Sequence, residues 1–108
     1  MRYSFYVFLT CLIILISKEF ISAQSNLFDT IKINELIEKS NLLRKQNLDS
    51  ALLLSNQSVI LSESLKDETL KKIFIVKSLN VKGMIFVGKG FSDSALICFN
   101  KTLQINQS

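Results

Sequence analysis

The sequence predicts an all-α fold in which two helix–turn–helix repeats stack as a short right-handed α-solenoid of four helices, after an N-terminal signal helix. Two six-residue stretches, 48–53 (LDSALL) and 92–97 (SDSALI), echo each other about 44 residues apart. Self-similarity at a period of about 20–50 residues is typical of stacked repeats. Apolar residues recur with helical spacing along most of the chain. The 108 residues include no proline and only three glycines, fewer turn residues than a β-rich domain requires.

Residues 1–23 have the three-part layout of a secretory signal peptide. Arg2 gives a positive start, residues 3–16 are almost entirely apolar, and Ala23 precedes the expected cleavage point. The apolar run is shorter than the roughly 20 residues that span a bilayer, which favours a cleaved signal over an uncleaved anchor. The sequence therefore predicts an exported protein, periplasmic or secreted, whose only membrane contact is this segment. Anchoring to the inner membrane by an uncleaved signal is the alternative.

The remaining residues, 24–108, form one predicted helical domain. Its helices are expected at about 30–45, 48–65, 68–87 and 92–104, so that the first unit covers about 31–65 and the second about 68–106. Asp29 or Thr30 is the expected N-cap of the first helix, and Asp67 that of the third. The turn at 88–90 (GKG) is expected to end the third helix, because glycine accepts positive φ at low cost. It lacks the features of a phosphate-binding loop.

A hairpin is the alternative for the third helix. Residues 73–76 and 84–87 are rich in β-branched and aromatic side chains. The segment between them has no tight-turn dipeptide, and the helical stripe continues through it, so helix is favoured. For the second and fourth helices, the spacing predicts that the large apolar residues face the core, namely Leu48, Ala51, Leu52 and Val59, and Ala95, Leu96, Phe99 and Leu103.

The second unit resembles a tetratricopeptide repeat. That family places a bulky residue, a glycine four positions on and an aromatic three further along its first helix, which Leu79, Gly83 and Phe86 match. Its second helix carries a small residue and an aromatic four positions later, as Ala95 and Phe99 do. The resemblance implies that the two small residues let the helices approach closely, while the three large ones fill the space around the contact.

The first unit matches this pattern less well. Ala51 takes the small position, but Lys39 stands where the family has glycine and Ser55 where it has an aromatic. The period also exceeds the usual 34 or so residues of the family. Variants of the family with a longer period are familiar in exported bacterial sensor and regulator proteins, which this chain resembles in that respect. Because stacks normally need three or more repeats, we expect a fragment, a truncated reading frame or a unit completed by self-association.

Catalytic chemistry is not expected. The chain has no histidine, and Cys98 would be the only thiol once the signal with Cys11 is removed. This leaves no pattern for a metal site or a cofactor, and we expect Cys98 to be buried at a helix interface. Glu35 and Glu38 are expected on a solvated helix surface. The lysines are scattered, not gathered into a basic stripe, so nucleic acid is not an expected partner.

The resemblance implies a protein or peptide partner, held in a groove that the first helix of each unit lines. On the third helix the corresponding positions carry Val76, Asn80 and Met84, and Lys77 lies two residues before Leu79. Lys77 and Asn80 are compatible with the Lys and Asn of the family's carboxylate binders, whereas Met84 replaces an expected Asn. The matching positions of the first unit, Ile33, Leu36 and Ser40, supply no carboxylate clamp. A general groove for an extended segment or a helix is therefore expected. The predicted function is an exported interaction or scaffold module. The alternative is the sensor part of a membrane-bound regulator that signals to a kinase or DNA-binding part.

Overall fold

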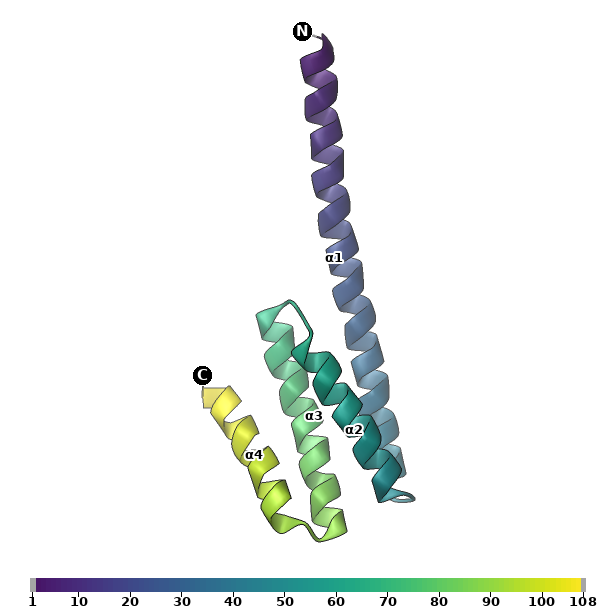
Figure 1. Ribbon diagram of the computed structural model, residues 1–108, viewed down its shortest axis with the longest axis vertical. Helices are drawn as coiled ribbons and strands as arrows, with labels where there is room; N and C mark the ends of the chain where they lie inside the picture. Colours follow the sequence, from purple (N-terminus) through teal and green to yellow (C-terminus); the bar gives the residue numbers. More distant parts are fainter. Residues whose placement is uncertain (1, 108) are drawn as a thin grey trace.

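The chain folds into four α-helices, seen in a computed structural model that describes residues 2–107 and, at Ser22 and Ala23, the backbone alone. The helices are α1 (Arg2–Leu43), α2 (Leu48–Glu63), α3 (Glu68–Lys89) and α4 (Ser92–Gln107) (Figure 1). No strand occurs in the described range. The all-α prediction is therefore confirmed, and the hairpin alternative is wrong because both of its arms lie inside α3.

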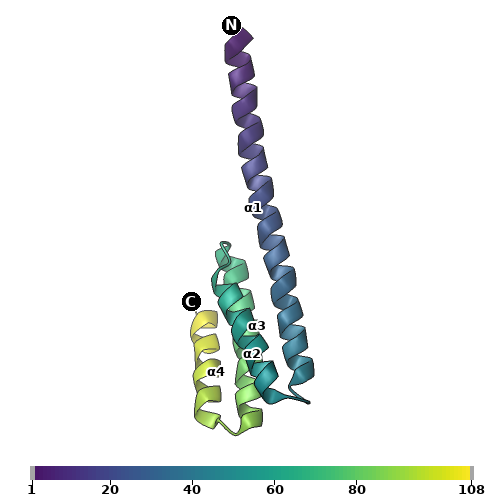
Figure 2. The same cartoon turned by 45° about the vertical axis from the view of Figure 1, so that its right-hand side comes forward.

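Helices that follow each other along the chain pack side by side. α1 contacts α2, α2 contacts α3, and α3 contacts α4, while α1 also reaches α3 (Figures 1 and 2). α2 and α4 make no such backbone contact with each other. The result is two helix–turn–helix units, α1 with α2 and α3 with α4, joined through the α2–α3 contact. α3 is the central helix, since it packs against each of the other three.

α1 is much longer than the first predicted helix. Its 42 residues correspond to about 63 Å at the usual helical rise. The expected N-cap at Asp29 or Thr30 is wrong, because the helix continues through both residues and the Thr30 hydroxyl donates to the Leu27 carbonyl at 2.8 Å. Neither proline nor glycine occurs before Gly83, so no residue interrupts the helical hydrogen bonds.

The N-terminal half of α1 stands clear of the other helices (Figure 1), and its large apolar side chains are exposed. Within the described residues, α1 is the helix that is long and apolar enough to cross a membrane, a test that signal sequences also pass. The predicted cleavage point after Ala23 lies within this helix, and the Ala23 side chain is outside the description.

Short polar side chains and one glycine set the other helix ends. The Asn47 side chain accepts from the Ser50 amide at 3.1 Å at the start of α2, and Asp67 accepts from the Leu70 amide at 3.0 Å at the start of α3, as predicted. Gly90 ends α3 with φ of +81°, the left-handed conformation expected of the turn at 88–90. The tight turns make α3 antiparallel to α2, and α4 antiparallel to α3.

The hydrophobic core consists of two clusters at opposite ends of α2. One joins Ile33, Leu65 and Phe74. The other joins Ala51, Val81 and Ile85. Ile37 of α1 packs against both clusters, so α1, α2 and α3 share one interior.

Between the two clusters the buried face of α2 is lined with serine. Ala51, Ser55, Ser58 and Ser62 follow one another at helical spacing and are all fully buried. The hydroxyl of Ser58 donates to the Ser55 carbonyl at 2.8 Å, and that of Ser62 donates to the Ser58 carbonyl at 2.6 Å. Bonds within the helix thus satisfy these hydroxyls. We call Ser55, Ser58 and Ser62 the serine stripe.

Two further buried serines face α2 from its neighbours. The Ser40 hydroxyl of α1 donates across the interface to the Ala51 carbonyl at 2.7 Å, and the hydroxyl oxygens of Ser62 and Ser78 lie 3.4 Å apart. Such small side chains permit close approach of the helix backbones. Leu48 and Leu52, which the spacing predicted on the core face, lie at the edge of this interface. They are only half-buried and pack against the second cluster.

α4 also uses a different face from the one predicted. Its buried residues are Ala95, Cys98 and Thr102, whereas Leu96 is 58% and Leu103 is 56% exposed. The physical reason is that α4 packs against α3 alone, so no helix covers the side chains on its other faces. Burial of Cys98 agrees with the sequence prediction.

The serine stripe predicts that side-chain volume matters more than the hydroxyl. Ser58→Ala removes only a bond within the helix, and we expect it to change the free energy of unfolding by less than about 1 kcal/mol. Ser58→Leu overfills the interface and should cost about 1–3 kcal/mol or more. Urea unfolding followed by circular dichroism measures both. Ser40→Ala, which removes a bond between helices, should cost more than Ser58→Ala; the reverse order would contradict this account.

Candidate partner-binding surfaces

The three predicted groove residues lie on one face of α3. Lys77, Asn80 and Met84 are spaced three and four residues apart, and all three are exposed. The Lys77 ammonium lies 5.3 Å from the centre of the Phe74 ring, a cation–π distance that holds its aliphatic stem along the helix. Ile73 and Val87 add exposed apolar surface to the ends of α3. We call Lys77, Asn80 and Met84 the Lys77 face.

The first unit does not extend the Lys77 face as its sequence position suggested. Ile33 and Ser40 are fully buried and Leu36 is half-buried, so these side chains pack inside or beside the core. Met84 instead lines a cavity of about 450 Å³ next to the α1–α2 turn, with Arg44, Lys45 and Leu48. The Lys77 face thus continues toward Arg44 and Lys45 in the α1–α2 turn.

The residues that the resemblance assigns to repeat packing lie where α3 meets α4. Leu79 and Ala95 are buried, and Phe86 and Phe99 are half-buried. A Cβ atom added to Gly83 would lie only 2.6 Å from Cε1 of Phe99, closer than atoms can approach without a shift. Absence of a side chain at residue 83 therefore makes room for the Phe99 ring. Ala51 is fully buried between α2 and its neighbours.

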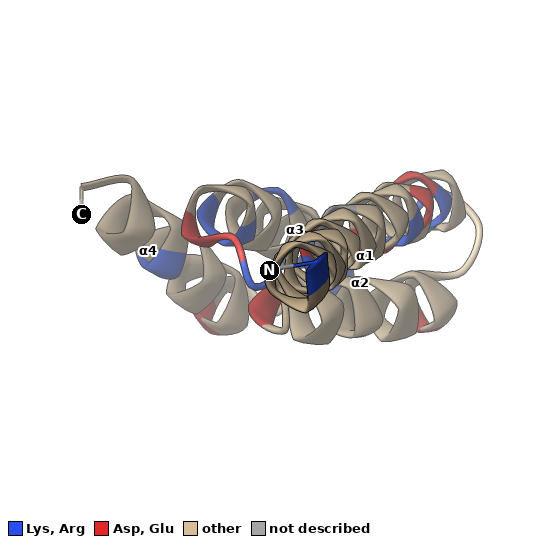
Figure 3. Cartoon of the chain, turned by 90° about the horizontal axis from the view of Figure 1, so that it is seen from above, with Lys and Arg blue, Asp and Glu red and all other residues tan. Residues whose placement is uncertain are grey.

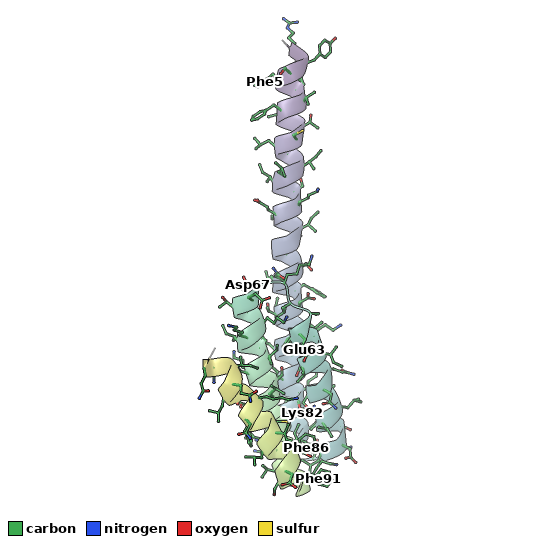
Figure 4. The ribbon with its side chains drawn as sticks, turned by 60° about the vertical axis from the view of Figure 1, so that its left-hand side comes forward. Phe5, Glu63, Asp67, Lys82, Phe86 and Phe91 are labelled. Atoms are coloured by element: carbon green, nitrogen blue, oxygen red, sulfur yellow. The ribbon has the colours of Figure 1, made fainter. Side chains whose placement is uncertain are left out.

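A second concave surface, which the sequence did not indicate, lies on the other side of α3. It is a cavity of about 660 Å³ whose walls are α2 and α4 and whose floor is α3. Its polar lining residues are Asn56, Glu63, Lys82, Lys101 and Gln104, and its apolar ones include Ile60 and Leu79. Figure 4 shows Glu63 on α2, and Lys82 and Phe86 on α3. We call this cavity the α2–α4 groove.

Two lysines give the α2–α4 groove its charge. Lys82 extends from α3 and Lys101 from α4, and Glu63 is the acidic residue of the lining. Burial raises the pKa of the Cys98 thiol, and the positive charges of Lys82 and Lys101 oppose that rise. Both ammonium groups therefore act on the same region of α4. The Lys82 ammonium also lies 5.9 Å from the centre of the Phe86 ring.

Asn56 supplies an unusual polar atom in the same groove. Its side-chain oxygen is buried and accepts no hydrogen bond within residues 2–107. Buried acceptors in folded proteins are nearly always paired. Asn56 also lines the α2–α4 groove, but this oxygen itself is buried and is not exposed to the groove.

Charged residues elsewhere are spread over the helices and form no single basic face (Figure 3). The ion pair present in the described range joins Lys89 at the end of α3 to Asp49 at the start of α2. No group of three or more metal-ligating side chains occurs among the described residues.

The Lys77 face was found by resemblance to a repeat family, and the α2–α4 groove was not found at all. Its residues come from three helices, and Asn56 and Lys101 are 45 positions apart in sequence. No local spacing joins them. The available signal was that the third helix is apolar on two sides, which favours cover from more than one side. One stripe consists of Ile73, Val76, Leu79, Gly83 and Phe86, and the neighbouring one of Phe74, Val81 and Ile85.

Comparisons with models of protein families, with curated proteins and with solved structures found no match. The class that the fold defines is thus an all-α protein of two packed helix–turn–helix units, with a long apolar N-terminal helix.

The contact between Gly83 and Phe99 predicts that substitutions at these two positions have coupled effects on the free energy of unfolding. Gly83→Ala forces the ring to move and should reduce the free energy of unfolding by about 1 kcal/mol, although alanine is the better helix former. In a Phe99→Leu background the added methyl group meets less obstruction, so the same change should be neutral or stabilising. Urea unfolding of the four variants gives the coupling energy. Equal effects of Gly83→Ala in both backgrounds would show that the ring is not the obstacle.

Proposed function

We propose that this chain is an exported, tetratricopeptide-like module that binds a protein or peptide partner. The Lys77 face supports the proposal most directly, because Asn80 and Met84, at positions that the resemblance places in a partner groove, share one exposed face of the central helix with Lys77. The close fit of Gly83 against Phe99 is the packing expected of such a repeat. The proposed role is therefore noncovalent binding or scaffolding, with no enzymatic step.

Exposed apolar side chains on the helical units add to this support. Leu96, Ile97 and Leu103 of α4 are each more than half exposed, as are Leu53 and Ile60 of α2. Exposed apolar patches commonly mark interaction sites. A partner that covered them would gain the hydrophobic contribution of that surface.

A second candidate function is the sensor part of a membrane-bound signal-transduction regulator, such as a histidine kinase or a DNA-binding regulator. The observation that favours it is the continuity of α1, which runs from Arg2 to Leu43 and enters the core at Ile33. An uncleaved α1 would connect a bilayer to the first repeat through one helix. A partner bound to the repeats could then displace the membrane segment.

The intact mass of the protein, which shows whether residues 1–23 have been removed, distinguishes these two candidate functions. Processing after Ala23 should yield a chain that begins at Gln24, as expected of a secreted or periplasmic module. Expression with a C-terminal tag, followed by cell fractionation and intact-mass measurement, gives the result. A full-length chain in the membrane fraction would contradict cleavage and favour the anchored regulator.

The Lys77 face should carry the affinity for the proposed partner. A photo-crosslinking residue at Asn80 would capture that partner, whose affinity is then measured with purified components. Lys77→Ala combined with Asn80→Ala should weaken binding by about tenfold, equivalent to about 1.4 kcal/mol. Lys66→Ala, in the exposed α2–α3 turn, serves as the control and should leave affinity unchanged. Equal affinity of the double variant and the wild type would reject this face.

A further inference from the structure

Ahead of the core, α1 carries an apolar face that no other helix of the described chain covers. Successive residues of a helix are turned by about 100°, so positions 20, 21, 24, 27, 28 and 31 lie between about 120° and 240° around the axis from the core residue Ile33. Five of these residues are apolar and more than half exposed, and the sixth is an exposed glutamine. We call this set the α1 stripe; it consists of Phe20, Ile21, Gln24, Leu27, Phe28 and Ile31.

The opposite side of the same segment is polar and faces the repeats. Asn26, Asp29 and Thr30 lie within about 60° of Ile33 around the helix axis, and all three are half-buried. A surface helix of a soluble domain normally turns its apolar side to the core and its polar side to water. In this part of α1 the two sides are reversed. An exposed apolar face of this kind indicates a surface that another molecule covers.

Lipid accounts for only part of the α1 stripe. The hydrocarbon core of a bilayer is about 30 Å thick, which about 20 helical residues span. Counted from Tyr3, the first residue after the charged Arg2, such a span ends near position 22. Leu27 and Ile31 lie about 8 and 14 Å further along the helix axis. When α1 is retained in a membrane, these two side chains therefore stand outside the hydrocarbon.

A second copy of the chain presents the same stripe at the same height. Two chains anchored by α1 in one bilayer have the same orientation, so equivalent residues lie at equal distances from the membrane. Their stripes can then form a two-fold symmetric contact between parallel helices, in which each residue meets its counterpart. Confinement to the membrane also raises the effective concentration of one stripe near another. A different partner would need a matching apolar face at this height, whereas every copy of this chain has one.

The spacing of the α1 stripe suits a pair of parallel helices. Ile21, Gln24, Phe28 and Ile31 alternate three and four residues apart, which is the spacing of a coiled-coil seam. The surface of α1 alone also forms a recess of about 560 Å³, lined by Ile21, Gln24, Ser25, Leu27, Phe28 and Ile31. A side chain of a second helix can occupy such a recess, as knobs fill holes in coiled coils.

The contact has a defined end and a limited size. The next two positions of the seam are Glu35 and Glu38, which are exposed, and carboxylates that face their counterparts repel each other. With roughly 200 Å² for a fully exposed residue of this size, Leu27, Phe28 and Ile31 present about 350 Å² per copy to water. A pair removes about 700 Å² from water, less than the roughly 1,200 Å² of a stable interface between free proteins. Pairing through this stripe therefore requires that the membrane holds both chains.

We propose that two copies of the membrane-anchored chain pair in parallel along the α1 stripe. Leu27, Phe28 and Ile31 of each copy cover those of the other outside the hydrocarbon. The two sets of repeats lie on opposite sides of the helix pair, because the core-facing side of each α1 points away from the contact. The Lys77 face, which belongs to α3, takes no part in it. The proposal rests on the second candidate function, in which α1 is retained.

Disulfide cross-linking of the full chain in phosphatidylcholine liposomes tests the pairing. Cell-free synthesis into the liposomes keeps α1 intact, and Cys11→Ser with Cys98→Ala removes the native thiols. Oxidation should convert Gln24→Cys to a covalent dimer at least about fivefold faster than Asn26→Cys, because residue 26 lies on the opposite side of the helix, too far from its counterpart for a disulfide. Ile31→Cys should cross-link as well, since residues of parallel helices meet their own counterparts.

A matched pair of charge variants gives an independent readout. In the Gln24→Cys chain, Ile31→Asp should slow cross-linking at least about fivefold, because it places two carboxylates in the contact. Asn26→Asp adds the same charge on the opposite side of the helix and should change the rate by less than about twofold. Circular dichroism confirms that both variants are folded.

Equal cross-linking at positions 24 and 26 would overturn the proposal, because the stripe would then face lipid or water and not a second copy. Equal slowing by the two aspartate variants would overturn it as well. Removal of residues 1–23 in cells, seen in the intact mass, would exclude both the anchored candidate and this pair. A retained chain that fails to cross-link would exclude the pair alone, and partner binding at the Lys77 face is measured separately from both results.

Discussion

Close approach of the helix backbones through small side chains is the constraint on which this structure depends. α2 meets α1 and α3 with Ala51 and the serine stripe, and α3 meets α4 where Gly83 leaves space for Phe99. A Cβ atom at position 83 would lie only 2.6 Å from the Phe99 ring, and large apolar side chains of α1, α2 and α3 gather in two clusters toward the ends of α2. The serine hydroxyls donate to carbonyl groups of their own helix or of the neighbouring one. Serine can therefore serve as a small buried residue without leaving its hydroxyl unpaired.

The helices were largely predictable because their signals are local. Apolar spacing located all four, and Asp67 and Gly90 marked two of their ends correctly. The faces were less predictable, because a hydrophobic pattern does not show how many neighbouring helices will cover a helix, and α4 packs against α3 alone. Leu96 and Leu103 are aligned as a core face but remain exposed, and Cys98 and Thr102 are buried in their place. The start of α1 was missed for a related reason: Asp29 and Thr30 can cap a helix, but neither stops one that is already formed.

The two candidate surfaces differ in how far they could be predicted from the sequence. The Lys77 face is local to one helix, so spacing alone places its residues together, and the resemblance supplies the reason to look there. The α2–α4 groove exists only because α2 and α4 lie on either side of α3 without touching. Its lysines and Asn56 are brought together by two interhelix contacts, and the depth of each contact depends on side-chain size. Sequence spacing cannot specify such a site without those contacts.

The central helix links packing to binding. α3 contacts every other helix, and Leu79 is both buried in the packing of α3 and part of the groove lining. The fit of Phe99 against Gly83 determines how closely α4 approaches α3, and the position of α4 determines where Lys101 stands relative to Lys82. A larger residue at position 83 would therefore displace one wall of the groove as well as weaken the fold. The Lys77 face, whose residues all belong to α3, keeps its geometry as long as that helix is formed. The geometry of the groove thus depends on the packing of three helices, whereas that of the Lys77 face depends on a single helix.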